Sequence, residues 1–312
     1  METRKRIIPC DKKGEEVKGE KEREYIFFKV QFNSFRDVGN STENEVRDKE
    51  EMNECECVLA LPESYTDDGQ PTQLILACHG AGSNVMEAKN QVGGLIPVAK
   101  SIDAGYAALD ISGSRWHGLT MGCPEHLFAL YKAYKYAINH YNLTTSVLLA
   151  GGSMGGQTAL NFAAMFPSIV LAAGIFFPRL NIDGVDVDGH YCRGTWDKTE
   201  KKGDSPSTRE RIIDVFRFPD SEWCDRNTVG SNSYRLRSYV GADGKRVVIP
   251  PCPIKIWQGT ADKVTDPVMA VEFINSIWRS GSYAEIHLLD GVGHNVTEVM
   301  KEEQVIWFNR FK

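Results

Sequence analysis

The stretch LLAGGSMGGQTAL, residues 148–160, joins an apolar run typical of a buried strand to a run of small residues typical of a helix. Ser153 stands at the junction, with glycines at positions 151, 152, 155 and 156. Residues 151–155 fit the pattern G-x-S-x-G, which places a serine on a tight strand-to-helix turn with its hydroxyl exposed. Glycine suits such a turn because larger side chains would clash with the strand and the helix. The alternative is the glycine-rich turn of a phosphate-binding or simply well-packed βα unit, but the Walker lysine and the G-x-G-x-x-G spacing are missing.

Short apolar runs and helical patterns alternate on both sides of this stretch. Strands are predicted at residues 25–32, 55–62, 73–80, 106–112, 146–152, 171–178, 253–259 and 284–290. Helices are predicted at residues 126–141, from Ser153 to near Pro167, from Pro267 to Gly281, and from about Thr297 onward. This alternation predicts an α/β fold with a mostly parallel central sheet and helices on both faces.

Two segments depart from the alternation. Residues 1–54 are expected to form a charged leader with one possible strand, because the first 24 residues carry eight basic and seven acidic side chains. Residues 55–312 then form the main domain. Within it, the segment from about 179 to 252 is too long for a plain loop, and we expect it to be a cap inserted over one edge of the sheet.

Two other strand ends supply candidates for an acid and a base. Asp262 follows the strand that ends at Gly259, and His294 follows the strand that ends at Asp290. Taken singly, Asp262 fits a loop or helix-capping aspartate and His294 fits a surface histidine. The chain order serine, aspartate, histidine is nevertheless the order of a nucleophile-acid-base triad on a sheet of this kind.

The strand at 73–80 ends in His79-Gly80-Ala81-Gly82, a turn of small residues that would let backbone N–H groups approach a developing oxyanion. The N–H groups of Met154 and of Ala81 or Gly82 are the candidate donors. His79 is a candidate substrate contact or a structural hydrogen-bonding residue of the loop. Trp116, beyond the strand at 106–112, is a candidate pocket residue, although a buried packing tryptophan is at least as good an interpretation.

The motifs HGAG, GGSMGG, GTAD and GVGH, each at the end of its own strand, make residues 55–312 resemble the α/β-hydrolase superfamily. The resemblance is strongest to esterases and prolyl-oligopeptidase-like hydrolases, including enzymes that act on acylated carbohydrates. It implies Ser153 as nucleophile, His294 as base and Asp262 as acid, with no metal or organic cofactor. It also implies a short-acyl ester substrate, such as an acetylated or feruloylated carbohydrate. A prolyl-oligopeptidase-like peptidase and a non-catalytic binding or structural module are the alternatives.

Charge and hydropathy limit which partners and which cellular compartment the sequence favours. The net charge of -6 gives no basic surface for nucleic acid or an anionic membrane. No signal region or apolar run of membrane-spanning length is present, so we expect a cytoplasmic protein, or one carried in an extracellular or virion assembly. Cys192 and Cys224 lie in one irregular region where a disulfide is conceivable, and the sequence does not decide the oligomeric state.

Overall fold

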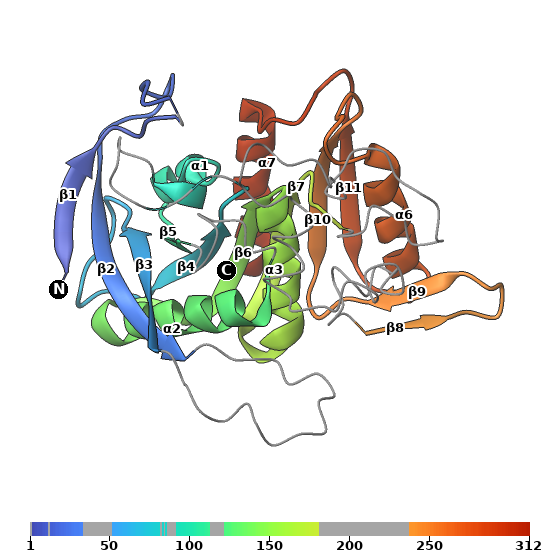
Figure 1. Cartoon of the computed structure of the whole chain (residues 1–312), viewed down its shortest axis with the longest axis horizontal. Helices are drawn as coiled ribbons and strands as arrows, with labels where there is room; N and C mark the ends of the chain where they lie inside the picture. Colours follow the sequence, from blue (N-terminus) through green and yellow to red (C-terminus); the bar gives the residue numbers. More distant parts are fainter. Residues whose placement is uncertain are drawn as a thin grey trace, which may run out of the picture.

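The computed structural model describes residues 2–11, 13–33, 52–81, 83, 85, 92–112, 122–180 and 237–312. Their main feature is a nine-stranded sheet with the strand order β1-β2-β3-β5-β4-β6-β7-β10-β11 (Figure 1). The strands are β1 Thr3–Ile7, β2 Arg23–Asn33, β3 Met52–Ala60, β4 Thr72–Cys78, β5 Ala107–Ile111, β6 Leu143–Gly152, β7 Val170–Phe176, β10 Ile254–Gly259 and β11 Ala284–Leu289.

Six neighbouring strands, from β5 to β11 in that order, are parallel, and β1, β2 and β3 continue the sheet as an antiparallel edge. The predicted mostly parallel sheet is therefore confirmed. Every residue of β5 is buried, as expected for a strand covered on both faces. Because parallel strands end at the same side of a sheet, the loops after β4, β6, β7, β10 and β11 gather along one edge.

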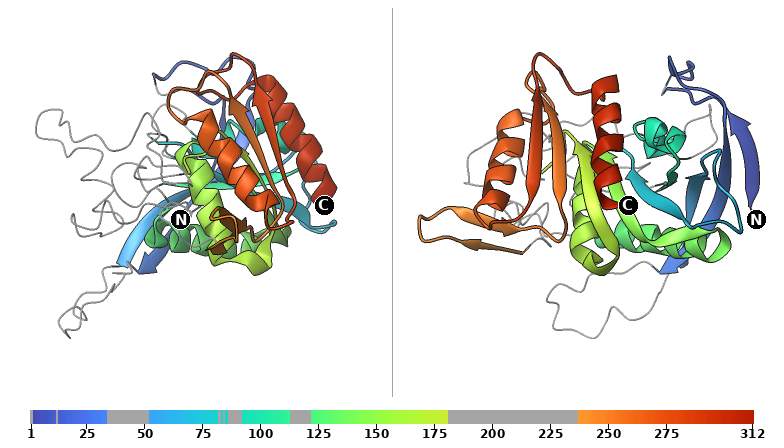
Figure 2. Two further views of the ribbon diagram at one scale, coloured as in Figure 1. Left: turned by 90° about the vertical axis from the view of Figure 1, so that its right-hand side faces the viewer. Right: turned by 180° about the vertical axis from the view of Figure 1, so that it is seen from behind.

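Helices cover both faces of the sheet, as Figure 1 and the opposite view in Figure 2 show. The core on one face includes α2 Pro124–His140, α3 Met154–Met165 and α6 Pro267–Trp278. The core on the other face includes α1 Ala99–Asp103 and α7 Glu298–Phe308. Short 3-10 helices lie at Gly93–Leu95, Pro167–Ile169 and Asn309–Phe311. None of the helices in the described ranges is both long and apolar enough to cross a bilayer.

Helices α6 and α7 each begin at a residue whose side chain caps the helix. The Asp266 side chain caps α6 by accepting a hydrogen bond from the Val268 N–H at 3.0 Å, and Pro267 occupies the first helical position. Thr297 caps α7 in the same way through the Met300 N–H at 3.3 Å. Both helices therefore begin where the sequence predicts.

Side chains of helix α7 donate hydrogen bonds to backbone carbonyls of β7, which lies between β6 and β10 in the sheet. Gln304 Nε2 donates to the carbonyl of Gly174 at 3.0 Å, and Trp307 Nε1 donates to the carbonyl of Ala173 at 3.1 Å. A side chain at Gly174 would meet the Trp307 ring at 3.1 Å, so glycine allows this close approach.

The predicted charged leader contains a second strand that the sequence did not indicate. Thr3–Ile7 form β1, which pairs antiparallel with β2 along the edge of the sheet. The strand has no apolar signature because most of its side chains are exposed, a common property of edge strands. Its place in the sheet depends on backbone pairing and on Ile7, which is buried.

The segment predicted as a cap is described only at its two ends. Residues 237–252 include an unpredicted hairpin of β8 Arg237–Val240 and β9 Arg246–Ile249, whose Val248 joins the core beside α6. Cys192 and Cys224 lie outside the described residues, so their pairing is not tested. The cap between the two described ends likewise stays a prediction.

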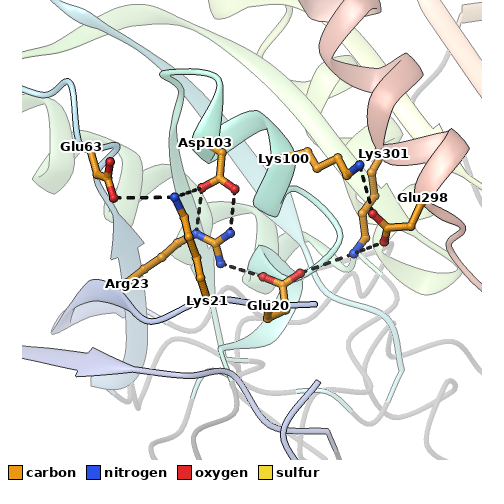
Figure 3. A network of polar contacts seen from close by, with 8 residues as sticks. All are labelled: Glu20, Lys21, Arg23, Glu63, Lys100, Asp103, Glu298 and Lys301. Carbon is orange, nitrogen blue, oxygen red and sulfur yellow. Dashed lines mark hydrogen bonds and ion pairs between the residues drawn. The ribbon is translucent and has the colours of Figure 1, made fainter. Parts of the chain in front are cut away.

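A network of ion pairs joins the N-terminal segment to α1 and α7 (Figure 3). The carboxylate of Glu20 lies 2.7 Å from Arg23 Nη1 and 3.5 Å from Lys301 Nζ. Arg23 also lies 3.0 Å from Asp103, and Lys301 lies 3.1 Å from Glu298 at the start of α7. The side chains of Glu20 and Arg23 are only 5% and 8% exposed, so each charge is stabilised by its charged partners and not by water.

Candidate active site

Ser153 lies between β6 and α3 in a backbone conformation that non-glycine residues rarely adopt, with φ 55° and ψ −121°. Its N–H donates to the carbonyl of Phe176 at 3.0 Å. Its carbonyl accepts from the N–H groups of Gly156 at 3.1 Å and Arg179 at 2.9 Å. The strained turn is thus held by β7 and by the segment that follows β7.

The glycines around Ser153 permit close backbone contacts. A Cβ on Gly155 would lie 2.7 Å from the carbonyl oxygen of His79, and one on Gly156 would lie 2.7 Å from the Cβ of Pro178. A Cβ on Gly151 would collide with the backbone of Gly155 itself. Helix α3 therefore packs directly against the ends of β4 and β7, which places its N-terminus beside Ser153.

Asp262 and His294 meet although 32 positions separate them in the chain. His294 Nδ1 lies 2.8 Å from Asp262 Oδ2. The two loops are joined by the Ala261 N–H, which donates to the carbonyl of Val292 at 3.0 Å. Gly259 makes the approach possible, because a Cβ there would lie 2.7 Å from the Val292 carbonyl carbon.

The Asp262 carboxylate is buried and accepts several hydrogen bonds. Its Oδ1 accepts from the N–H groups of Val264 at 2.8 Å and Thr265 at 3.0 Å, and its Oδ2 accepts from Gln258 at 3.3 Å. Burial raises the pKa of this carboxyl, but the hydrogen bonds from His294, Thr265 and Val264 outweigh it, so the pKa lies below its ordinary value. Asp262 is therefore ionised at neutral pH.

An ionised partner fixes the tautomer of His294. Because a carboxylate only accepts hydrogen bonds, Nδ1 of His294 must carry the hydrogen, which leaves Nε2 of the neutral ring as an acceptor. The imidazole is partly accessible, with 22% of its side chain exposed. It can therefore take a proton at Nε2 while Asp262 stabilises the resulting positive charge.

Ser153 is linked to this pair through Phe177 rather than by a direct bond. The Phe177 ring lies 4.5 Å from the His294 ring between centroids, and its Cε2 would lie 3.3 Å from a Cβ on Gly152. Among the described residues, no hydrogen bond joins the Ser153 hydroxyl to His294. Ser153 follows β6 and His294 follows β11, two strands that β7 and β10 separate, and the structure does not join the two side chains by a hydrogen bond.

The loop after β4 lies against Ser153. A Cβ on Gly80 would be 3.9 Å from the Ser153 Cβ. His79 is 3% exposed, and its Nδ1 faces the carbonyl of Gly80 at 3.0 Å, which suits a role in shaping the loop. Met154 is the first residue of α3. Ala81 is partly buried in the same loop.

Gly82 and Trp116 lie outside the described residues. Their predicted roles in the oxyanion hole and the substrate pocket stay predictions.

Asp110, which the sequence analysis did not single out, supports this loop from behind. The side chain is fully buried at the end of β5 and accepts hydrogen bonds from the backbone N–H groups of Gly94, Ile111 and His79. Burial raises its pKa to about 6. A charged residue inside the apolar run AALDI was the available signal for such a role.

Phe177 and Thr265 also contact the site and were not predicted. Phe177 has φ 33°. The stretch IFFP contains no glycine or asparagine that would indicate this conformation, and the sequence therefore predicted a strand here. Thr265 Oγ1 lies 2.8 Å from Asp262 Oδ2.

A cavity of about 510 Å³ opens elsewhere, near β1, β2 and α1, and none of the predicted site residues lines it. Its basic side chains are already paired with carboxylates: Arg4 with Glu24, Arg6 with Glu22, and Lys21 and Arg23 with Asp103. The cavity therefore offers no excess charge to select a ligand, and the strand ends around Ser153 remain the candidate site.

Solved structures share this arrangement of strands and helices. A puromycin-hydrolyzing peptidase from Mycobacterium tuberculosis aligns with a TM-score of 0.57 and 12% identity over 83% of this chain. The chain has the α/β-hydrolase fold. A truncated carbohydrate esterase from gut microbiota also aligns with this chain, with a TM-score of 0.55 and 15% identity. An S-formylglutathione hydrolase from Agrobacterium tumefaciens aligns with a TM-score of 0.53 and 16% identity.

The α/β-hydrolase neighbours differ in how much of their own length is matched. This chain spans 37% of the peptidase, but 90% of the carbohydrate esterase and 96% of the S-formylglutathione hydrolase. The alignment with the carbohydrate esterase includes 81% of this chain, and the alignment with the S-formylglutathione hydrolase includes 93% of it. Comparisons with protein-family models and with curated proteins find no match.

Proposed function

We propose that this protein is a serine hydrolase that cleaves carboxylic esters through a covalent acyl-enzyme. The observations that carry the proposal are the partly buried hydrogen bond between Asp262 and His294 and the strained strand-to-helix turn that presents Ser153 at the same edge of the sheet. The alternatives of a loop aspartate and a surface histidine, taken singly, do not account for this contact. Together with the turn, the pair supplies a nucleophile, a base and a group that orients the base.

In the proposed reaction, the Ser153 oxygen attacks the ester carbonyl while Nε2 of His294 takes the hydroxyl proton. Asp262 holds the Nδ1–H of the ring and stabilises the imidazolium. The tetrahedral intermediate collapses as His294 returns the proton to the leaving alcohol, which leaves Ser153 acylated. Water then attacks the acyl group with His294 again as base, and the acid and free serine are released.

The oxyanion of each tetrahedral intermediate would be stabilised by backbone N–H groups. Met154 supplies one at the N-terminus of α3, where the helix dipole also favours negative charge. Ala81 or Gly82 would supply the second from the loop after β4. No step requires a metal or an organic cofactor.

For the substrate, we favour a short-acyl ester such as an acetylated or feruloylated carbohydrate. Support comes from the carbohydrate esterase and the S-formylglutathione hydrolase, which this chain matches over almost their whole length. The peptidase reading has weaker support because the puromycin-hydrolyzing peptidase is matched over only about a third of its length.

A fluorophosphonate probe tests the nucleophile, with Ser153→Ala as the blank. We expect stoichiometric labelling of the wild type and none of the variant. Equal labelling of both proteins would show that a residue other than Ser153 reacts, and no labelling of either would favour a non-catalytic α/β-hydrolase-fold module.

Aryl esters of two, four and eight or more acyl carbons, with aminoacyl anilides beside them, test the substrate class. We expect the acetyl ester to be cleaved fastest. A preference for long acyl chains or for the anilides would contradict the short-acyl assignment while leaving the serine mechanism intact.

A further inference from the structure

Phe177 is held in a strained conformation by both of its backbone groups. Its φ of 33° is unusual for an aromatic residue. The Phe177 N–H donates to the carbonyl of Trp257 at 2.7 Å, and the Phe177 carbonyl accepts from Thr265 Oγ1 at 3.2 Å. Strain of this kind persists only where surrounding contacts determine the conformation, and it concentrates at functional sites.

The left-handed turn directs the Phe177 ring toward the candidate base. The ring is 4% exposed and packs at 4.5 Å between centroids from the His294 ring, with an interplanar angle of 52°. A Cβ added at Gly152, the residue before Ser153, would lie 3.3 Å from Cε2 of the ring. The ring therefore lies close to both the serine turn and the imidazole, and its packing on the imidazole opposes rotation of that ring.

The Thr265 hydroxyl connects Phe177 to the acid. It lies 2.8 Å from Asp262 Oδ2, 3.2 Å from the Phe177 carbonyl and 3.5 Å from His294 Nδ1. It has one hydrogen for two acceptors, so its position is a compromise between the carboxylate and the strained carbonyl. Thr265 is 1% exposed, so its hydroxyl is shielded from bulk water.

We propose that Phe177 and Thr265 are positioning residues that together set the plane of the His294 ring. Thr265 fixes the carboxylate oxygen that receives Nδ1–H, and Phe177 fixes the face of the ring. This inference rests on the proposed function. It adds that the alignment of the base depends on two residues outside the triad, which act through His294 and Asp262 and not on the substrate.

Loss of either contact leaves the ester site intact but lets the imidazole turn away from Ser153. The effect therefore falls on kcat rather than on KM. For Thr265→Val, which keeps the shape and removes the hydroxyl, we expect kcat to fall about 10- to 100-fold with KM within about threefold of wild type. Thr265→Ser keeps the hydroxyl and should restore kcat to within about threefold.

Phe177→Leu tests the ring separately and gives a second route if Thr265→Val is too unstable. We expect it to lower kcat about tenfold with KM nearly unchanged. Ser276→Ala is the matched control, because Ser276 is also a buried hydroxyl bonded to a backbone carbonyl, that of Phe273 at 2.6 Å, within α6. It should lower the melting temperature without lowering kcat.

The measurements are steady-state kinetics with an aryl acetate and the rate of fluorophosphonate labelling, on protein whose fold is checked by circular dichroism. If the wild type is not labelled, the proposed function fails and this inference fails with it. If the wild type is labelled but folded Thr265→Val or Phe177→Leu keeps the wild-type kcat, the positioning role alone is overturned. Equal loss of kcat in Thr265→Val and Thr265→Ser would also overturn it, because the hydroxyl would then not be the cause.

Discussion

Gly155→Ala should separate the geometry of the serine turn from its chemistry, because Gly155 has no side chain to lose. A Cβ at this position would collide with the carbonyl oxygen of Cys78 and would lie 2.7 Å from both the Cys78 carbonyl carbon and the His79 oxygen, where ordinary contact begins at 3.4 Å. These are backbone atoms of the β4 end and cannot rotate aside. Relief of the clash therefore requires α3 and the end of β4 to separate by more than about 1 Å.

Two effects of the methyl group oppose each other in the free energy of unfolding. Alanine is favoured over glycine inside a helix by about 1 kcal/mol. Overpacking of a close contact costs about 1–3 kcal/mol, so we expect a small net loss of stability. The separation also moves the Met154 N–H relative to the loop carrying Ala81, and a misplacement of about 1 Å at an active site can cost about 100-fold in rate.

The assay is kcat/KM for an aryl acetate together with the thermal melting temperature. We expect a fall in kcat/KM of about 100-fold with a folded protein. Gly293→Ala is the control, because a Cβ there meets only Asn295 Oδ1 at 3.9 Å. A Gly155→Ala enzyme with wild-type kcat/KM would refute the argument that this contact sets the oxyanion geometry.

Three further predictions concern the acid, the buried aspartate and the ion-pair network. Asp262→Asn should lower kcat by about 10³- to 10⁴-fold, because an amide no longer fixes the imidazole tautomer; retention of more than about a tenth of kcat in steady-state assays would argue against the triad. The pKa of Asp110 is raised to about 6 in the fold, so the folded state binds more protons than the unfolded state between about pH 4 and 6, and this carboxyl makes the fold less stable as pH rises through that window. Asp110→Asn should remove that contribution, which is at most about 3 kcal/mol, from the pH dependence of urea unfolding; identical slopes in the two proteins would contradict it. Glu20→Gln should lower the free energy of urea unfolding by about 1–3 kcal/mol because it leaves buried Lys301 and Arg23 short of a carboxylate, whereas Glu54→Gln in an exposed pair should cost less than about 1 kcal/mol, and equal losses would show that burial is not the cause.

The sequence predicts the parallel part of the sheet and the strand ends well because both depend on local patterns. Buried parallel strands are continuous apolar runs, and the turns after them need glycine at close contacts such as Gly155 and Gly259. The predicted acid and base were placed by this logic, and the structure joins Asp262 to His294 by a hydrogen bond. The catalytic roles themselves stay predictions.

The features that sequence reasoning missed depend on tertiary contacts instead. β1 is a charged edge strand whose pairing has no apolar signature. Phe177 adopts a left-handed conformation without glycine, because Trp257 and Thr265 hold its backbone from distant parts of the chain. The support from Thr265 likewise exists only after β7 and the loop after β10 come together.

The docking of α7 on β7 has a consequence for how the chain folds during synthesis. Gln304 and Trp307 donate hydrogen bonds to carbonyls that lie 130 and 134 positions earlier, in β7, which has a neighbouring strand on each side. Until residues 298–308 leave the ribosome, the apolar face of β7 that they cover stays open to other chains. Contacts of such sequence separation also form slowly, since a long loop must close first. We therefore expect the nascent chain to need chaperone protection until α7 is complete, and premature termination before Glu298 to give aggregates rather than a smaller folded unit.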